Sequence, residues 1–234
     1  SFAAMAPGTI VVLHACCHNP TGADLSDAQW SDVVGLCKEG GLVPFLDMAY
    51  QGFADGIEQD TVAIRAFSAS GVQFFASSSF SKNFSLYGER VGALSIVTAN
   101  KDESTRVMSQ LKRVIRTNYS NPPIQGGALV AAVLASPELR QQWEIELAGM
   151  RDRIRAMRTG LVDAIKATGC AQDFSFVAMQ RGMFSYTGLT AAQVERMKDE
   201  FGIYAVSTGR ICLAALNTRN LDYVAGAIAT VTKG

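Results

Sequence analysis

The sequence predicts an α/β fold: a mostly parallel β-sheet covered by helices, then a small α+β domain, with one long helix between them. Over the first hundred residues, uninterrupted apolar runs alternate with segments of helical periodicity, as in parallel sheets covered on both faces. A helical pattern then extends over residues 137–168, and from residue 174 strand and helix patterns alternate. We therefore expect two domains, residues 1–149 and 150–234, bridged by the long helix.

The sheet of the first domain is expected to have four strands. Runs of β-branched and aliphatic residues predict them at residues 9–15, 42–46, 72–76 and 91–97. Helices are expected at 27–39, ended by Gly40 and Gly41, and at 61–69. The segment 82–90 is too short for a full crossover helix, so the direction of the fourth strand stays open.

Beyond residue 99 the pattern turns helical. One helix is expected at 103–116, and a second after Pro122 and Pro123. The long helix 137–168 carries an apolar stripe at Leu147, Met150, Ile154, Met157, Leu161 and Ile165. From residue 174 we expect the order strand, strand, helix, strand, strand, helix, with the helices at 191–201 and 221–231.

Composition and charge exclude several classes of protein. Of the 234 residues 48% are apolar, and 21 Lys and Arg balance 21 Asp and Glu. The sequence is too apolar for a disordered chain. It also lacks the excess of basic residues that is typical of nucleic-acid-binding proteins. The longest apolar runs are far shorter than the roughly 18 residues of a membrane span, and the first residues do not resemble a signal peptide. We expect a cytoplasmic protein with reduced cysteines and neither nucleic acid nor membrane as partner.

Three polar segments follow the first three expected strands. They are residues 18–22 (His-Asn-Pro-Thr-Gly), 47–50 (Asp-Met-Ala-Tyr) and 77–82 (Ser-Ser-Ser-Phe-Ser-Lys). Ligands of open parallel sheets bind outside the carboxyl ends of the strands. We therefore expect the side chains of Asn19, Asp47, Tyr50 and Lys82 to converge there.

Each of these residues also has an ordinary structural explanation. Asp47 could cap a turn, and Lys82 could be a solvated loop residue. Together they indicate chemistry, because a buried carboxylate needs a hydrogen-bonding or cationic partner to stay ionised. A lysine in an apolar crevice has a lowered pKa, as an imine-forming amine requires. Serines before Lys82 and the guanidinium of Arg90 after it suit a phosphate dianion.

These segments resemble the motifs of class I, fold type I, pyridoxal-phosphate aminotransferases, within them the aspartate and aromatic-amino-acid subgroup. The attachment signature is similar to residues 79–82 (Ser-Phe-Ser-Lys) followed by 88–92 (Gly-Glu-Arg-Val-Gly). Further matching motifs, in the family's order, lie at residues 18–22, 47–50, 120–123 (Ser-Asn-Pro-Pro), 182–186 (Gly-Met-Phe-Ser-Tyr) and 209–210 (Gly-Arg). The resemblance covers nearly the whole chain and implies the C-terminal part of the large cofactor domain plus the small domain.

The resemblance assigns the cofactor, pyridoxal 5′-phosphate, to named residues. Lys82 is expected to form a Schiff base with it and then to carry protons in catalysis. Asp47 would pair with the pyridine nitrogen, and Asn19 and Tyr50 would hydrogen-bond the phenolic oxygen. The phosphate would be held by Ser79 and Arg90, the latter through its guanidinium fork.

The substrate residues implied by the resemblance are two arginines and Asn19. Arg210 is expected to bind the α-carboxylate of the substrate through its planar fork. Arg116 resembles the arginine that reaches from the neighbouring subunit of a homodimer to a dicarboxylate side chain. We expect amino-acid and 2-oxo-acid substrates, with ping-pong transfer from aspartate or aromatic amino acids to 2-oxoglutarate.

A metal site is the other chemistry that this region suggests. On a strand, His14, Cys16 and His18 would share a face, with Cys17 next to them. Structural zinc sites usually draw ligands from two spaced pairs, and no second pair follows, so we expect no metal.

Members of the family that this chain resembles are longer. We therefore also expect that the chain is a fragment, or that it is accompanied by a complementary N-terminal chain. Two alternatives stay open. The chain could be a non-catalytic fragment or assembly subunit, or an enzyme using the same cofactor for another reaction, such as β-elimination. Arg116 argues against the latter.

Overall fold

The computed structural model describes residues 2–233, which form two compact units. The first unit comprises residues 2–16, 25–52 and 56–146, and the second comprises residues 17–24, 53–55 and 147–233. Among the described residues, no helix has both the length and the hydropathy that crossing a membrane would require.

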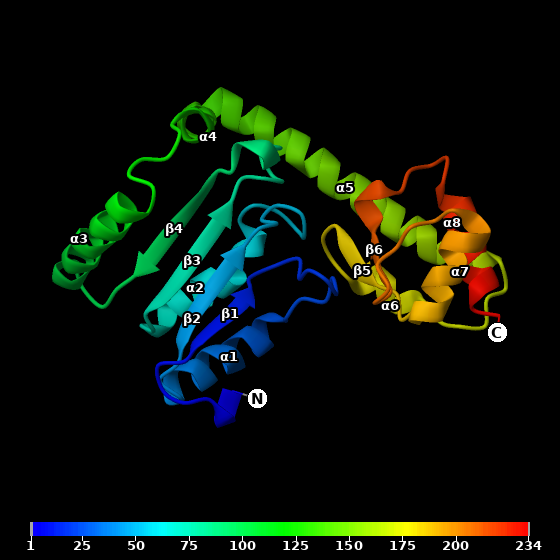
Figure 1. The fold of residues 1–234 in the computed structure, drawn as a ribbon, viewed down its shortest axis with the longest axis horizontal. Coiled ribbons are helices and arrows are strands. Elements are labelled where there is room, and N and C mark those ends of the chain that lie inside the picture. Colours follow the sequence, from blue (N-terminus) through cyan, green and yellow to red (C-terminus); the bar gives the residue numbers. More distant parts are fainter. Residues whose placement is uncertain (1, 234) are drawn as a thin grey trace. The chain divides into compact units, whose positions relative to one another are not determined.

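The first unit is built on a mixed four-stranded sheet (Figure 1). Its strands lie side by side in chain order: β1 (Ile10–His14), β2 (Val43–Met48), β3 (Phe74–Ser79) and β4 (Gly92–Val97). The first three strands are parallel, and β4 is antiparallel to β3. Only the short 3₁₀ turn η3 (Tyr87–Glu89) lies between β3 and β4, and a parallel return would need a longer crossover. The short segment between β3 and β4 thus explains why β4 is antiparallel, a direction that the sequence pattern left open.

The helices of the first unit follow local signals in the sequence. Helix α1 (Asp27–Glu39) begins with a capping box, in which Ser26 and Gln29 bond each other's backbone N–H, as expected for a stable first turn. Helix α2 (Val62–Ser70) ends at Gly71, whose φ of 75° suits a glycine. The unit also contains η1 (Phe2–Ala4), η2 (Gln59–Thr61), α3 (Lys101–Asn118) and α4 (Gln125–Ala135).

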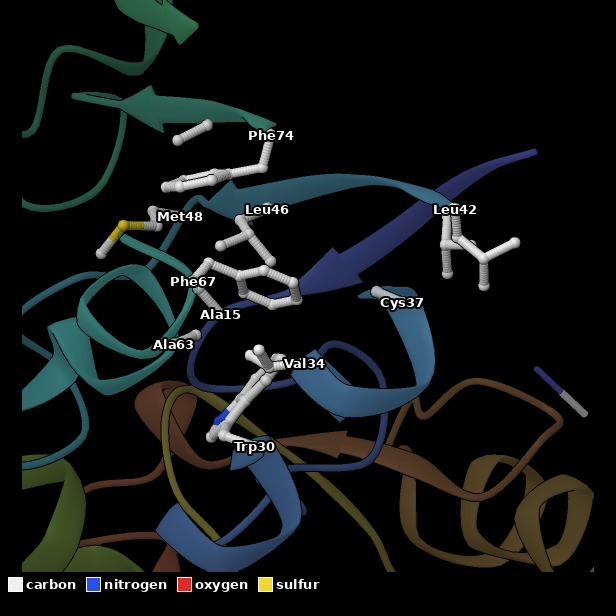
Figure 2. Close-up of a cluster of buried hydrophobic side chains, with 12 residues drawn as sticks. Ala15, Trp30, Val34, Cys37, Leu42, Leu46, Met48, Ala63, Phe67 and Phe74 are labelled. Atoms are coloured by element: carbon white, nitrogen blue, oxygen red, sulfur yellow. The ribbon is translucent and has the colours of Figure 1, made fainter. Parts of the chain in front are cut away.

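One face of the sheet carries the core (Figure 2). Side chains from α1 and α2 meet those of the strands in a buried cluster that includes Trp30, Val34, Cys37, Leu46, Met48, Ala63, Phe67 and Phe74. Phe67 and Phe74 pack with ring centroids 5.7 Å apart. Because strand side chains alternate between faces, Ile10 and Val12 on either side of the buried Val11 point away from this core and are exposed. The packed face fixes the register of the strands, and therefore which side chains reach the strand ends.

The second unit is α+β. Helix α5 (Pro137–Ala167) begins in the first unit and continues into the second. It is followed by α6 (Ser175–Met179), β5 (Phe184–Tyr186), α7 (Ala191–Phe201), β6 (Arg210–Cys212), η4 (Leu213–Ala215) and α8 (Leu221–Val231). Strands β5 and β6 form an antiparallel pair.

Two expected strands of this unit are wrong. Where the first strand was expected, the structure has the short helix α6. Just before it, Asp173 accepts hydrogen bonds from the backbone N–H and hydroxyl of Ser175, a local turn that competes with extended backbone. Between α7 and α8 there is one strand, β6, followed by η4 rather than by a second strand. Arg153 donates to the carbonyls of Ala214 and Leu216, which stabilises that turn.

Candidate functional site

Asp47 lies near the carboxyl end of β2, where two neighbouring strands supply polar partners. Ser77 is its register partner on β3 and donates its hydroxyl to Asp47 Oδ1 over 3.1 Å. On the other side His14 of β1 brings its Nε2 to 4.0 Å from Asp47 Oδ2. The Asp47 carboxylate thus lies between a hydroxyl donor and an imidazole, and at this edge of the sheet it can pair with a cationic group.

The side chain of Lys82 lies over the ring of Tyr50, a residue that follows strand β2. Its Nζ is 4.6 Å from the ring centroid of Tyr50, which is buried, and 6.0 Å from that of Tyr87. Such contacts between a cation and an aromatic face are attractive and favour this position of the side chain. The primary amine is thus placed beside a phenol, a combination suited to imine and proton-transfer chemistry.

The backbone next to Lys82 is anchored from two directions. The amide of the buried Asn83 donates to the carbonyl of Gln51 over 3.3 Å, and Trp143 Nε1 donates to the carbonyl of Asn83 over 2.7 Å. Trp143 also stacks on Phe84, with centroids 4.4 Å apart. These contacts tie the Lys82 backbone to the segment that follows Tyr50.

Ser79 and Arg90 flank the point where β3 and β4 separate. Ser79 is the register partner of Gly92, and the Phe80 N–H donates to the Val91 carbonyl over 3.1 Å. Arg90 has a left-handed backbone (φ 54°) and an exposed guanidinium 5.6 Å from the Tyr87 ring. A hydroxyl and a guanidinium fork at one strand end can bind an anion such as phosphate.

In the second unit the structure joins Arg210 and Asn19, which are 191 residues apart. Arg210 Nη1 donates to Asn19 Oδ1 over 2.9 Å, and its guanidinium carbon is 4.7 Å from the ring centroid of Phe184. Stacking and one side-chain hydrogen bond leave other N–H groups of the guanidinium for a carboxylate. A guanidinium arranged in this way can bind a carboxylate.

The Asn19 loop is docked onto β5 through close backbone contacts. Gly22 accepts a hydrogen bond at its carbonyl from the Arg181 N–H over 2.7 Å. Its φ is +72°, and a Cβ there would lie 2.6 Å from the carbonyl oxygen of Phe184. Only glycine fits this contact, which fixes the loop relative to the Phe184 strand.

The predicted site residues therefore form two groups. The first unit holds Asp47, Tyr50, Ser79, Lys82 and Arg90, and the second holds Asn19 and Arg210. That the two groups share one ligand stays a prediction. Arg116 is exposed at the end of α3 and donates to the hydroxyl of Ser120.

Three residues of these arrangements had no role assigned from the sequence: Ser77, Tyr87 and Phe184. Ser77 could have been found from strand alternation, since it shares a face with Ser79 at the strand end. Tyr87 contacts Lys82 and Arg90, which are near it in the chain, but no motif singled it out. Phe184 lies in the 182–186 motif, but its place against Arg210 depends on a contact between distant segments. Of the suspected metal ligands, His18 places Nδ1 2.6 Å from the Thr21 hydroxyl, and His14 lies beside Asp47.

The chain is similar to one family along nearly its whole length. The family model described as aminotransferase class I and II matches residues 3–228. An aspartate aminotransferase of Pseudomonas aeruginosa is 66% identical over 95% of this chain and 56% of its own length. An aromatic-amino-acid aminotransferase of Escherichia coli is 51% identical over the same shares.

Solved structures agree with these relatives. An aromatic-amino-acid aminotransferase from Burkholderia pseudomallei, covalently bound to pyridoxal phosphate, superposes with a TM-score of 0.98 at 70% identity. The match covers 99% of this chain and 58% of that protein. The chain thus spans little more than half the length of the relatives it matches.

Proposed function

The chain belongs to the class I and II aminotransferase family, and on that premise we propose that the protein carrying it transfers amino groups between amino acids and 2-oxo acids with pyridoxal 5′-phosphate. The observation that carries the proposal is the Lys82 amine 4.6 Å above the Tyr50 ring. The two residues follow neighbouring parallel strands, and Asp47 lies near the carboxyl end of one of them, β2.

The donor set of the first unit fits this cofactor. An amine can hold an aldehyde covalently, a carboxylate can pair with a protonated pyridine nitrogen, and a phenol can hydrogen-bond a phenolate oxygen. Lys82, Asp47 and Tyr50 would take these three roles. Ser79 and Arg90 would bind the phosphate, and Asn19 would assist Tyr50 at the phenolic oxygen.

When bound, pyridoxal phosphate would supply an electron sink for the bonds at the substrate α-carbon. Lys82 would remove and return the α-proton, since an amine freed from its covalent bond is a suitable general base. Tyr50 would keep that amine close through its ring. Asp47 would keep the ring nitrogen protonated.

Substrate orientation is assigned to Arg210. The guanidinium of Arg210 would bind the substrate α-carboxylate through two N–H groups. Asn19 and the Phe184 ring would keep the guanidinium in the plane of that carboxylate. A fixed carboxylate leaves the amino group and the α-proton in defined positions, which lowers the entropic part of the barrier.

We further propose that aspartate and aromatic amino acids are both donors and that 2-oxoglutarate is the acceptor. The mixed names of the relatives, aspartate and aromatic-amino-acid aminotransferases, support dual use. In a homodimer, Arg116 would serve a dicarboxylate side chain bound in the neighbouring subunit. A cytoplasmic location is part of the same proposal. A complementary N-terminal chain finds no support in the relatives, so we do not include it.

The test is a comparison of initial rates in the protein that carries this chain. Aspartate, tyrosine and phenylalanine are each paired with 2-oxoglutarate. We expect all three to react, Lys82→Ala to abolish nearly all turnover, and Lys101→Ala, an exposed lysine at the start of α3, to change little. Wild-type rates in Lys82→Ala would refute the assignment. Release of ammonia without an acceptor would indicate elimination instead.

A further inference from the structure

We propose that Arg158 is a positioning residue for carboxylate binding, acting through Phe184 on the Arg210–Asn19 pair. The inference rests on the proposed function, because it concerns the substrate receptor of that same site. Arg158 lies in α5, is only 2% exposed, and donates its hydrogen bonds to residues other than Arg210 and Asn19.

The buried guanidinium of Arg158 bonds several acceptors of the segment 177–185. It donates to the carbonyls of Val177, Gly182 and Phe184 over 3.1, 2.6 and 3.2 Å, and to the hydroxyl of Ser185. Burial lowers the pKa of Arg158 to about 10, while Cys17 and Asp24 oppose the shift. The side chain is still charged at neutral pH, so its bonds to the carbonyls are charge-assisted.

The first connection to the receptor runs through Phe184. Its carbonyl is held by Arg158, and its ring lies 4.7 Å from the Arg210 guanidinium carbon. The strand of Phe184 also pairs with the strand that begins at Arg210, with Tyr186 as the partner of Arg210. A displacement of Phe184 would therefore move the surface on which Arg210 rests.

The second connection runs through the Asn19 loop. The Phe184 carbonyl oxygen is the atom that a Cβ on Gly22 would meet at 2.6 Å. A Cβ on Gly182 would meet Cys17 Cβ at 2.5 Å. The Asn19 loop therefore contacts the segment 182–184 closely at both of its ends, at Cys17 and at Gly22. Arg158 thus holds the Phe184 carbonyl that contacts Gly22 and the Gly182 residue that contacts Cys17, and through both it helps to set the position of the loop that presents Asn19.

A buried arginine is a costly way to stabilise a fold, because the cation loses its hydration. The cost is understandable where several carbonyls must be held at fixed positions at once, which the planar, five-donor guanidinium does and a lysine ammonium does not. Since Arg210 would bind the carboxylate alike in the ground and transition states, misplacing it should raise KM more than it lowers kcat.

The experiment uses the protein that carries this chain, with Arg158→Met, Arg158→Lys and the control Arg153→Met. Arg153 is a matched control because it lies in the same helix and also donates to two carbonyls, those of Ala214 and Leu216. Three quantities are measured: KM and kcat for aspartate, the calorimetric dissociation constant of the unreactive dicarboxylate succinate, and the melting temperature.

We expect Arg158→Met to weaken succinate binding and raise KM by at least about tenfold, as loss of a charge-assisted contact would, with a smaller change in kcat. Arg158→Lys should be intermediate, and Arg153→Met should bind succinate within about twofold of wild type, whatever its melting temperature. Wild-type binding by Arg158→Met, or equal weakening by Arg153→Met, would overturn the inference. If Arg158→Met does not fold, unchanged binding by Arg158→Lys overturns it. A wild-type protein that binds no dicarboxylate overturns the proposed function as well.

Discussion

Gly22 offers a sharp test of how the Asn19 loop is held, because the chain contains a second glycine with the same backbone angle. Gly22 and Gly169 both have a φ of +72°, but a Cβ on Gly169 would meet nothing within 4 Å. Alanine at either position occupies the left-handed region, at a cost of about 1–2 kcal/mol. Gly169→Ala therefore measures the backbone penalty alone.

Gly22→Ala adds a collision with backbone that cannot rotate away. The new Cβ would lie 2.6 Å from the Phe184 oxygen, so loop and strand must separate by at least about 0.4 Å to reach the 3.0 Å below which real Cβ contacts are essentially absent. The same displacement would stretch the 2.9 Å bond between Arg210 and Asn19 to about 3.3 Å, outside the normal range. A hydrogen bond to a charged group contributes about 1.5–3 kcal/mol, so KM should rise by about tenfold to hundredfold.

The assay pairs the free energy of unfolding, from urea denaturation, with KM for aspartate in the protein that carries this chain. Gly169→Ala should lose stability with KM unchanged. Gly22→Ala should lose more stability and also raise KM. Equal effects of the two substitutions on both quantities would refute the reasoning, since they would show that the contact with Phe184 does not position Asn19.

Two further predictions concern the first unit. Phe67→Ala empties a fully buried position of the core cluster in Figure 2 and should lower the free energy of unfolding, measured by urea denaturation, by about 3–5 kcal/mol. Val12→Ala, at an exposed strand position, should change it by less than about 1 kcal/mol. Similar losses in the two variants would contradict the described core. Burial raises the pKa of the Cys37 thiol, so Cys37 should react with a disulfide reagent at pH 8 far more slowly than the exposed Cys212. Above the usual thiol pKa the unfolded chain ionises at Cys37 and the folded chain does not, so the free energy of unfolding should fall with pH, and less steeply in Cys37→Ala.

Local signals were sufficient for much of the fold. Helices α1, α7 and α8 begin and end at the predicted residues, and α1 and α7 have capping boxes from Ser26 and Thr190. The α/β class and the polar segments at strand ends also follow from periodicity. These features depend on neighbours along the chain, which a sequence displays directly.

The errors and omissions have two causes: a local turn that composition does not reveal, and contacts between distant segments. Residues 175–179 have the composition of a strand, but the Asp173 side chain forms a local turn with Ser175 at their start. The Arg210–Asn19 bond spans 191 residues, and the stacking of Phe184 on Arg210 needs the β5–β6 pairing. Arg158 was one arginine among several on α5, and only the folded turn at Gly182 distinguishes it from Arg153.

The proposed function depends most on Lys82 as the residue that holds the cofactor. The most direct measurement adds pyridoxal phosphate to the protein that carries this chain, reduces with borohydride to fix any covalent attachment to an amine, and maps the modified residue by peptide mass spectrometry. We predict stoichiometric modification at Lys82 and none in Lys82→Ala. A label spread over the surface lysines, or located at another single lysine in the wild-type protein, would contradict the assignment.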